Sequence, residues 1–163
     1  MTSGCLGDVT DTDHCDFVCT RLGSFITRRC ATDACSWSLL PLQIARTTEA
    51  LLNDQRAAAG RSRLASRWDL QADATRQAEA MAARGSIYHQ QMVPLLGKWD
   101  AQWVSENVAN NFISAGAPGL VKLWMESTGH RVNLLDERAT HTGCGVVQRD
   151  GWNWSSCVYA KLN

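Results

Sequence analysis

The chain has 163 residues, no net charge at pH 7, and a hydrophobic fraction of 45% beside a charged fraction of 20%. This length fits one domain, or one domain with an appendage, and the composition is that of a globular protein that can build its own core. No basic stripe is present, so we expect no nucleic-acid partner. No apolar run approaches the ~20 residues of a membrane-spanning helix, and we expect a monomer without a transmembrane segment.

The beginning of the chain differs from the rest. It is rich in Thr, Asp, Ser, Gly and Cys and shows no sustained period of 2 or 3.6. We interpret residues 1–43 as a Cys-rich appendage and residues 44–163 as the folded domain. The appendage holds five of the seven cysteines, Cys5, Cys15, Cys19, Cys30 and Cys35. An unordered tail is favoured over a disulfide knot, because five is an odd count, and over a zinc site at His14, Cys15 and Cys19, because the Cys-x2-Cys spacing is missing.

Two amphipathic helices are predicted next. The first follows Pro41, has apolar side chains at helical spacing, and ends at Gly60. The second begins near Leu70 and ends at Gly85. Its apolar stripe consists of Leu70, Ala74, Ala78, Met81 and Ala82. Because most of these side chains are small, another element can approach this helix closely.

The middle of the chain is less regular. Residues 86–103 have no period and contain both proline and glycine, which predicts a long loop. A short element is predicted around residues 104–108. A third helix is predicted over residues 117–127, with Gly129 ending it.

A β-hairpin is predicted at the end of the chain, with strands over residues 143–147 and 152–159 and an Arg-Asp-Gly turn at 149–151. In this register Cys144 and Cys157 lie level on facing strands, where Cβ atoms are about 4.5–5.5 Å apart. We therefore predict a disulfide between them, with two buried thiols as the alternative. A disulfide implies an oxidising compartment.

Three separated polar segments are the best lead to function. They are Tyr88-His89, Glu106-Asn107, and a run from Ser127 to Leu135 that contains His130. Together they supply two imidazoles and a carboxylate, at places where predicted elements begin or end. If the fold brings these groups together, they can hold a divalent metal or a small polar ligand.

In this order, the segments resemble the CAP superfamily of cysteine-rich secretory, antigen 5 and pathogenesis-related class 1 proteins, also called SCP-like. The bacterial secreted branch is the best match, and the likeness runs from about Ile44 to Leu162. The motifs that carry it are LLNDQRA at 51–57, WDL at 68–70, YH at 88–89, SENVA at 105–109, STGHRVNLL at 127–135 and TGCGVV at 142–147. Each motif is weak alone, and six in the right order are specific.

This resemblance implies an α+β fold, a three-layer α-β-α sandwich with a small antiparallel central sheet. It also implies an extracellular protein, which agrees with the predicted disulfide. Residues 1–20 point the other way, because they lack the charged and apolar stretches of a signal peptide and by themselves predict a cytosolic chain.

The resemblance also implies a cleft, which in this family is lined by two histidines and two acidic residues. By motif, His89 is identified as the first histidine, Glu106 as the first acid and His130 as the second histidine. The second acid is missing, because Ser127 stands at its position and Glu126, one residue earlier, is rotated by about 100° around the helix. The resemblance therefore implies three cleft residues, which we predict to be ligands of Zn²⁺ or another divalent cation.

Binding is favoured over catalysis for this cleft. We expect this cleft to recognise a metal or a small ligand outside the cell. The ligand could be a lipid, because tryptophans could line an apolar groove. Those tryptophans are Trp99, Trp103, Trp152 and Trp154. The alternatives are a metal-dependent hydrolase or peptidase, with Glu106 as its catalytic residue, and a non-catalytic interaction module with a vestigial cleft. In a purely structural interpretation, Glu106 only pairs with buried backbone or with the imidazoles.

Overall fold

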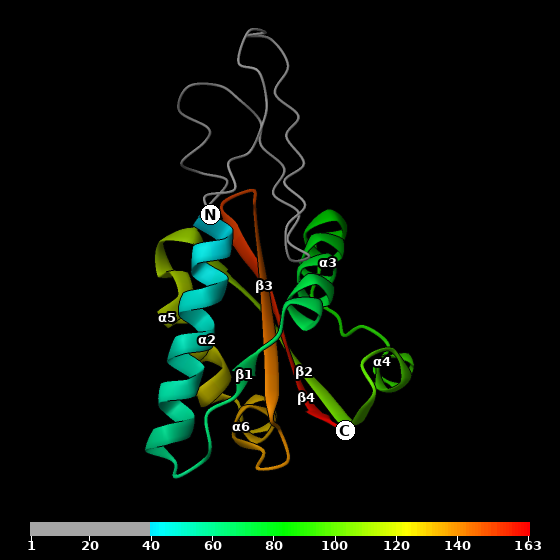
Figure 1. Ribbon diagram of the computed structural model, residues 1–163. Helices are drawn as coiled ribbons and strands as arrows, with labels where there is room; N and C mark the ends of the chain where they lie inside the picture. Colours follow the sequence, from blue (N-terminus) through cyan, green and yellow to red (C-terminus); the bar gives the residue numbers. More distant parts are fainter. Residues whose placement is uncertain (1–39) are drawn as a thin grey trace, which may run out of the picture.

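The computed structural model describes residues 40–163, which form two helical layers around a sheet (Figure 1). The helices are α2 (Leu40–Ala58), α3 (Trp68–Arg84), α4 (Val93–Lys98), the 3-10 turn η1 (Ile113–Ala115), α5 (Gly116–Glu126) and α6 (Thr128–Leu135), and the strands are β1 (Ala65–Ser66), β2 (Ala101–Phe112), β3 (His141–Arg149) and β4 (Trp152–Leu162). Helices α2, α5 and α6 lie on one side of the sheet, and α3 and α4 lie on the other. The predicted three-layer α-β-α sandwich of the α+β class is confirmed.

The appendage predicted over residues 1–43 lies almost entirely outside the described residues, and so do the candidate zinc ligands His14, Cys15 and Cys19. Helix α2 already begins at Leu40. The domain boundary at residue 44 stays a prediction.

The sheet has the strand order β1-β3-β4-β2, so β2 is an edge strand. Strands β3 and β4 form the predicted hairpin, and the turn residues Asp150 and Gly151 have φ values of 52° and 83°. Two positive φ values in a two-residue turn match the twist of the flanking strands, which explains the Asp-Gly pair. Strand β2 is antiparallel to β4, while the two-residue β1 adds a short parallel pairing with β3.

Helix α3 crosses the sheet unusually closely at two glycines. A Cβ atom on Gly143 would overlap the α3 backbone at Leu70, and one on Gly145 would overlap it at Ala74 and Thr75. The side chains of Leu70 and Ala74 are completely buried there. The small side chains of the α3 stripe therefore allow the close approach expected from the sequence.

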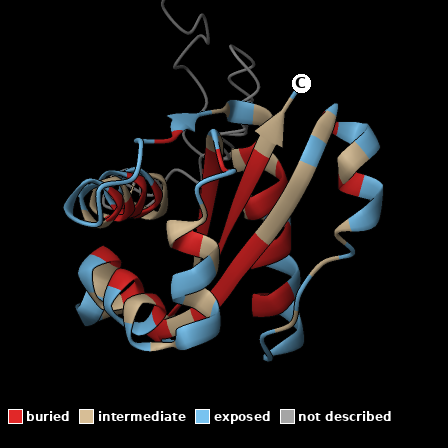
Figure 2. Ribbon diagram, turned by 90° about the horizontal axis from the view of Figure 1, so that it is seen from below, coloured by how far each residue is buried: buried red, intermediate tan, exposed pale blue. Residues whose placement is uncertain are grey.

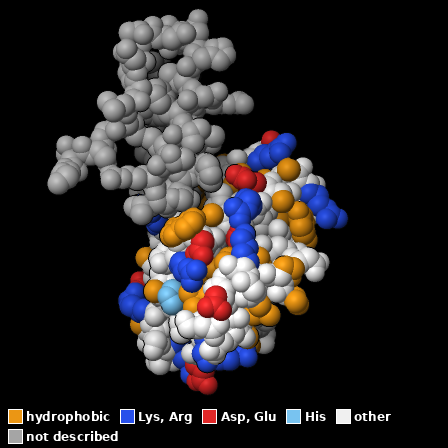
Figure 3. All heavy atoms as spheres, turned by 45° about the vertical axis from the view of Figure 1, so that its right-hand side comes forward, with side chains coloured by type: hydrophobic (Ala, Val, Ile, Leu, Met, Phe, Trp, Pro, Cys, Tyr) orange, Lys and Arg blue, Asp and Glu red, His pale blue; other side chains and the backbone are white. Residues whose placement is uncertain are grey.

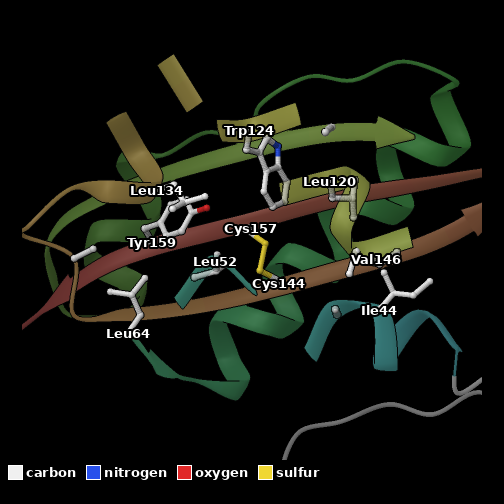
Figure 4. Close-up of a cluster of buried hydrophobic side chains, with 14 residues drawn as sticks. Ile44, Leu52, Leu64, Leu120, Trp124, Leu134, Cys144, Val146, Cys157 and Tyr159 are labelled. Carbon is white, nitrogen blue, oxygen red and sulfur yellow. A yellow bond between two sulfur atoms is a disulfide. The ribbon is translucent and has the colours of Figure 1, made fainter. Parts of the chain in front are cut away.

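The opposite face of the sheet carries a core around a disulfide (Figure 4). Cys144 and Cys157 face each other in the β3–β4 ladder with a Cα–Cα distance of 4.1 Å, and the predicted disulfide joins them. Leu52, Trp124 and Tyr159 pack in the same fully buried cluster. With a sequence separation of 13, the chain-entropy estimate for this cross-link is about 3 kcal/mol.

Three predicted elements differ from the structure. The expected loop over 86–103 contains helix α4, the short element at 104–108 is part of the 12-residue strand β2, and Gly129 lies inside helix α6 instead of ending a helix. The local prediction for α4 was wrong because its proline stands in the first turn, where no backbone donor is needed. In addition, the buried carboxylate of Asp73 holds the end of α4 through Lys98 Nζ at 2.7 Å and Trp99 Nε1 at 2.9 Å.

Burial follows the layers, since the central strands are buried and each helix exposes its outer side (Figure 2). On the side of α3 and α4, basic and acidic side chains are interspersed, with scattered hydrophobic groups between them (Figure 3). Within residues 40–163, no helix combines the length and the apolar character needed to cross a membrane.

Candidate functional site

The candidate site lies on the edge strand β2, where Glu106 and Asn107 are neighbours. Consecutive side chains of a strand point to opposite faces of the sheet, so these two residues reach into different layers. Glu106 meets the segment between α3 and α4, and Asn107 meets α6. Both residues are buried, with exposed fractions of 3% for Glu106 and 0% for Asn107.

The Glu106 carboxylate accepts four hydrogen bonds, which we call its donor shell. Oε2 lies 2.9 Å from His89 Nδ1 and 3.2 Å from the backbone N of Gln90. Oε1 lies 2.8 Å from Gln90 Nε2 and 2.7 Å from Ser156 Oγ. Two carboxylate oxygens have about four lone-pair positions, so the donor shell occupies the whole acceptor capacity of this group.

His89 lies above this carboxylate with 54% of its side chain exposed. Because the carboxylate is an acceptor, the contact assigns the proton of a neutral imidazole to Nδ1 and leaves Nε2 with a lone pair. Among the described residues, Nε2 has no hydrogen-bond partner. This is the arrangement of a carboxylate–histidine pair that presents one ring nitrogen to a ligand.

The segment that carries His89 is held at the residue before it. Gln77 Nε2, on α3, donates a hydrogen bond to the carbonyl oxygen of Tyr88. The guanidinium of Arg84 lies over the Tyr88 ring, 4.8 Å from its centroid. Glu106 therefore holds the His89 ring, and α3 holds the backbone of the residue before it.

Helix α6 is joined to the same edge by asparagine side chains. Asn107 Nδ2 donates to the carbonyl oxygen of His130 at 2.9 Å. Asn133 Nδ2 reaches back to Asn107 Oδ1 at 3.1 Å and to the carbonyl oxygen of Glu106 at 3.3 Å. Because β2 is an edge strand, its Glu106 carbonyl has no neighbouring strand on that side, and Asn133 supplies the missing donor.

The end of α6 is fixed by a buried arginine of α2. Arg56 has no exposed surface, and its Nη1 donates to the carbonyl oxygens of Leu134 at 2.8 Å and Asp136 at 2.9 Å. The last carbonyls of a helix lack partners within the helix, and a cation there is favourable. Arg56 thereby holds the helix that carries His130 and Asn133.

His130 is in the first turn of α6, and the residue is partly buried. Burial lowers the pKa of His130, and the neighbouring charge of His89 lowers it further. Both effects favour the neutral imidazole, which is the form that binds metals.

The junction between α5 and α6 is where the second acid of the family's cleft is expected, and the structure places no acidic side chain toward the site there. Ser127 stands between the two helices with an extended ψ of 122°. Glu126 is on the surface, where 64% of its side chain is exposed and its carboxylate lies 3.8 Å from Lys122 Nζ. Of the acids at or next to the expected positions, only Glu106 contacts a site histidine within residues 40–163.

The structure brings His89 and Glu106 into contact, and it places the backbone carbonyl of His130 against Asn107, the neighbour of Glu106. Within residues 40–163, no three His, Cys, Asp or Glu side chains are grouped so that they could hold a metal ion. Two members of the donor shell, Gln90 and Ser156, were not predicted. Gln90 follows His89 directly, which is a weak signal, whereas Ser156 lies 50 residues from Glu106 in the sequence.

Comparison with known proteins places the chain in a family. Residues 49–159 match the family "CAP: Cysteine-rich secretory protein family", which is more than half of the chain. A curated relative, the uncharacterized membrane protein YlbC of Bacillus subtilis (strain 168), is 40% identical over 53 residues, 32% of this chain and 15% of that protein. The chain thus spans a small part of that relative.

Solved structures show the same fold. An outer surface protein from Borrelia burgdorferi superposes with a TM-score of 0.66 at 14% identity, over 74% of this chain and 94% of that one. An SCP-domain extracellular protein from Bacillus anthracis gives 0.63 at 20% identity, over 83% of this chain and 45% of that one. A cysteine-rich secretory protein from Staphylococcus aureus gives 0.62 at 23% identity, over 74% and 39%. Together with the matched residues, this shows that the chain belongs to the CAP, or cysteine-rich secretory protein, family.

Proposed function

We propose that this CAP domain binds a divalent metal ion, or a small ligand in its place, at His89 and His130, with Glu106 behind His89. One observation carries the proposal: the 2.9 Å contact between His89 Nδ1 and Glu106 Oε2 orients an exposed imidazole with Nε2 free. A carboxylate in this position fixes the ring and raises the basicity of its other nitrogen. The predicted three-ligand set thereby becomes two imidazoles with a supporting carboxylate.

The donor set fits a divalent transition metal. Neutral imidazole nitrogens are good ligands for Zn²⁺, and two of them leave coordination positions open. A bound cation would supply a fixed positive charge and a Lewis acid to a ligand in the cleft. Because its pKa is lowered, the His130 imidazole stays unprotonated at a lower pH than an ordinary histidine does.

We further propose that recognition of the ligand takes place outside the cell. The disulfide supports this, because such bonds persist in oxidising compartments. The similar structures are described as outer surface, secretory and extracellular proteins. Binding rather than catalysis is proposed because Glu106 is the one carboxylate in contact with His89 in the described part of the chain, and its acceptor positions are already filled.

Isothermal titration calorimetry with ZnCl₂ tests the metal proposal. The wild type is expected to bind zinc at one site, and the double variant His89→Ala/His130→Ala is expected to lose that binding. His141→Ala is the matched control, because His141 begins β3 and contacts Thr140 Oγ1. Equal zinc binding by the wild type and the double variant would contradict the proposal.

A further inference from the structure

The sheet ends in an aromatic pair beside the β3–β4 turn, at the end opposite the C-terminus (Figure 1). In the strand register, Trp152 of β4 lies between Phe112 of β2 and Arg149 of β3, so the three form one row across the sheet. Side chains alternate along a strand, and Gly143 and Gly145 of β3 face α3, so this row lies on the α3 side as well. We call Phe112, Trp152 and Arg149 the end row.

The aromatic part of the end row presents an open ring face. Helix α3 ends at Arg84, and its last buried side chains, Met81 and Ala82, pack on rows further into the sheet. Phe112 is consequently 61% exposed, although it is large and apolar. Its ring stacks on that of Trp152, with 4.3 Å between the centroids and 26° between the planes. An exposed ring that is supported from behind offers a flat apolar surface to a ligand.

Two arginines flank this surface. Arg149 completes the end row with 53% of its side chain exposed, and its Nε lies 3.5 Å from the exposed carboxylate of Asp150. Such a pair in solvent is weak, so the guanidinium can change partner. On the other side, Arg84 lies over the ring of Tyr88, which packs in the same cluster as Trp152. The charge around the rings therefore favours an anionic ligand.

The row next to the end row carries polar groups. Asn110 and Trp154 are cross-strand partners there. Asn110 is partly exposed, and Trp154 Nε1 is buried without an acceptor among residues 40–163. A buried indole N–H usually has a partner. A ligand that carries oxygen atoms therefore fits this place better than a hydrocarbon chain does.

We propose that the end row binds an acidic sugar, that is, a pyranose ring with a carboxylate. One face of a pyranose consists of C–H groups, which pack on an aromatic face because the π-cloud is negative. The amide of Asn110 offers hydrogen bonds to ring hydroxyls, and the guanidinium of Arg149 offers a paired donor to the carboxylate. This site shares no side chain with the proposed metal function and stands independently of it.

Calorimetric titration with tri-galacturonic acid tests the proposal, and maltotriose is the neutral sugar of the same length. The wild type should bind the acidic trisaccharide about tenfold more tightly than maltotriose, and added NaCl should weaken the binding. Phe112→Leu keeps an apolar side chain but removes the ring, and the affinity should fall by about tenfold. Arg149→Gln removes the charge and should bring the affinities for the two sugars together.

Trp68→Leu is the matched control, because Trp68 is another exposed aromatic residue, 57% exposed at the first position of α3. It should bind the acidic trisaccharide as the wild type does. Urea denaturation shows whether each variant is folded. Because the Arg149 side chain is exposed, Arg149→Gln remains a valid test even if Phe112→Leu is unstable.

Weaker binding of tri-galacturonic acid by Phe112→Leu and Arg149→Gln, with Trp68→Leu unchanged, supports the proposal. A wild type that does not bind this sugar, that binds maltotriose equally well, or that binds no more tightly than Phe112→Leu and Arg149→Gln overturns it. Vesicles of anionic phospholipid form the last arm of the experiment. Binding to these vesicles that Phe112→Leu abolishes, without sugar binding, would assign the end row to a membrane surface and also overturn the proposal.

Discussion

The two sides of the edge strand β2 are fixed by different means. On the α3 side, glycines of β3 bring the helix backbone against the sheet, and the segment after α3 then carries His89 to Glu106. On the α6 side, a short helix is joined to the strand by the amides of Asn107 and Asn133 and by Arg56. Close backbone packing positions α3, and side-chain hydrogen bonds position α6. Substitutions should therefore separate the stability of the fold from the geometry of the site.

The largest effect is expected on the α3 side. In Gly145→Ala the new methyl group would overlap the α3 backbone at Ala74 and Thr75, and backbone cannot move aside as a flexible side chain can. We expect a loss of about 2–3 kcal/mol in the free energy of unfolding, measured by urea denaturation. Gly97→Ala in α4 is the control, because no atom lies within 4 Å of the added carbon. If both variants were equally stable, the close approach of α3 would be wrong.

On the α6 side we expect a smaller loss of stability, together with a local change at the site. Asn133→Ala removes the donor to Asn107 Oδ1 and to the Glu106 carbonyl. The expected loss is about 1 kcal/mol, since partly buried hydrogen bonds contribute modestly. The NMR signals of the His130 imidazole should shift, while those of His89 stay in place.

The control for Asn133→Ala is Val132→Ala, because Val132 is on the same helix and the residue is 60% exposed. It should change neither the stability nor the His130 signals appreciably. Equal shifts of both imidazoles in Asn133→Ala would show that the two sides of β2 are not held independently.

The smallest effect concerns pH and lies away from the cleft. Glu49 of α2 accepts hydrogen bonds from the Cys144 backbone N at 2.8 Å and from Ser66 Oγ at 2.6 Å, and burial raises its pKa above the usual value. The folded state therefore holds this proton to higher pH than the unfolded chain does. The contribution is fully favourable below the unfolded pKa of about 4.5 and is lost as pH rises through the folded pKa.

Glu49→Gln has a side chain of the same shape that does not titrate. Relative to this variant, the wild type should lose stability as the pH rises above about 4.5, as measured by denaturation at each pH. A difference in stability that does not change with pH would contradict the assignment.

Local patterns in the sequence predicted a large part of this fold. The Asp-Gly turn gave the register of the hairpin and with it the Cys144–Cys157 disulfide, because both depend on neighbouring residues. The helical spacing of small side chains predicted α3 in the same way. Helices α4 and α6 were missed because proline or glycine occurs in each, and contacts from Asp73 and Arg56 hold them in spite of it.

The site was predictable only in part. Motif order indicated His89, Glu106 and His130, and the structure places the first two in contact. The donor shell was not predictable, because Gln90 and Ser156 reach the carboxylate from segments 16 and 50 residues away in the sequence. Whether a carboxylate faces a ligand or is withdrawn behind a histidine depends on such long-range donors.

The most direct test of the central claim is a crystal structure of the protein soaked with ZnCl₂, with anomalous data collected at the zinc edge. The account predicts one cleft peak within bonding distance of His89 Nε2 and a ring nitrogen of His130, with Glu106 still bonded to His89 Nδ1, Gln90 and Ser156. A cleft without zinc, or zinc bound directly by Glu106 with the donor shell broken, would contradict it.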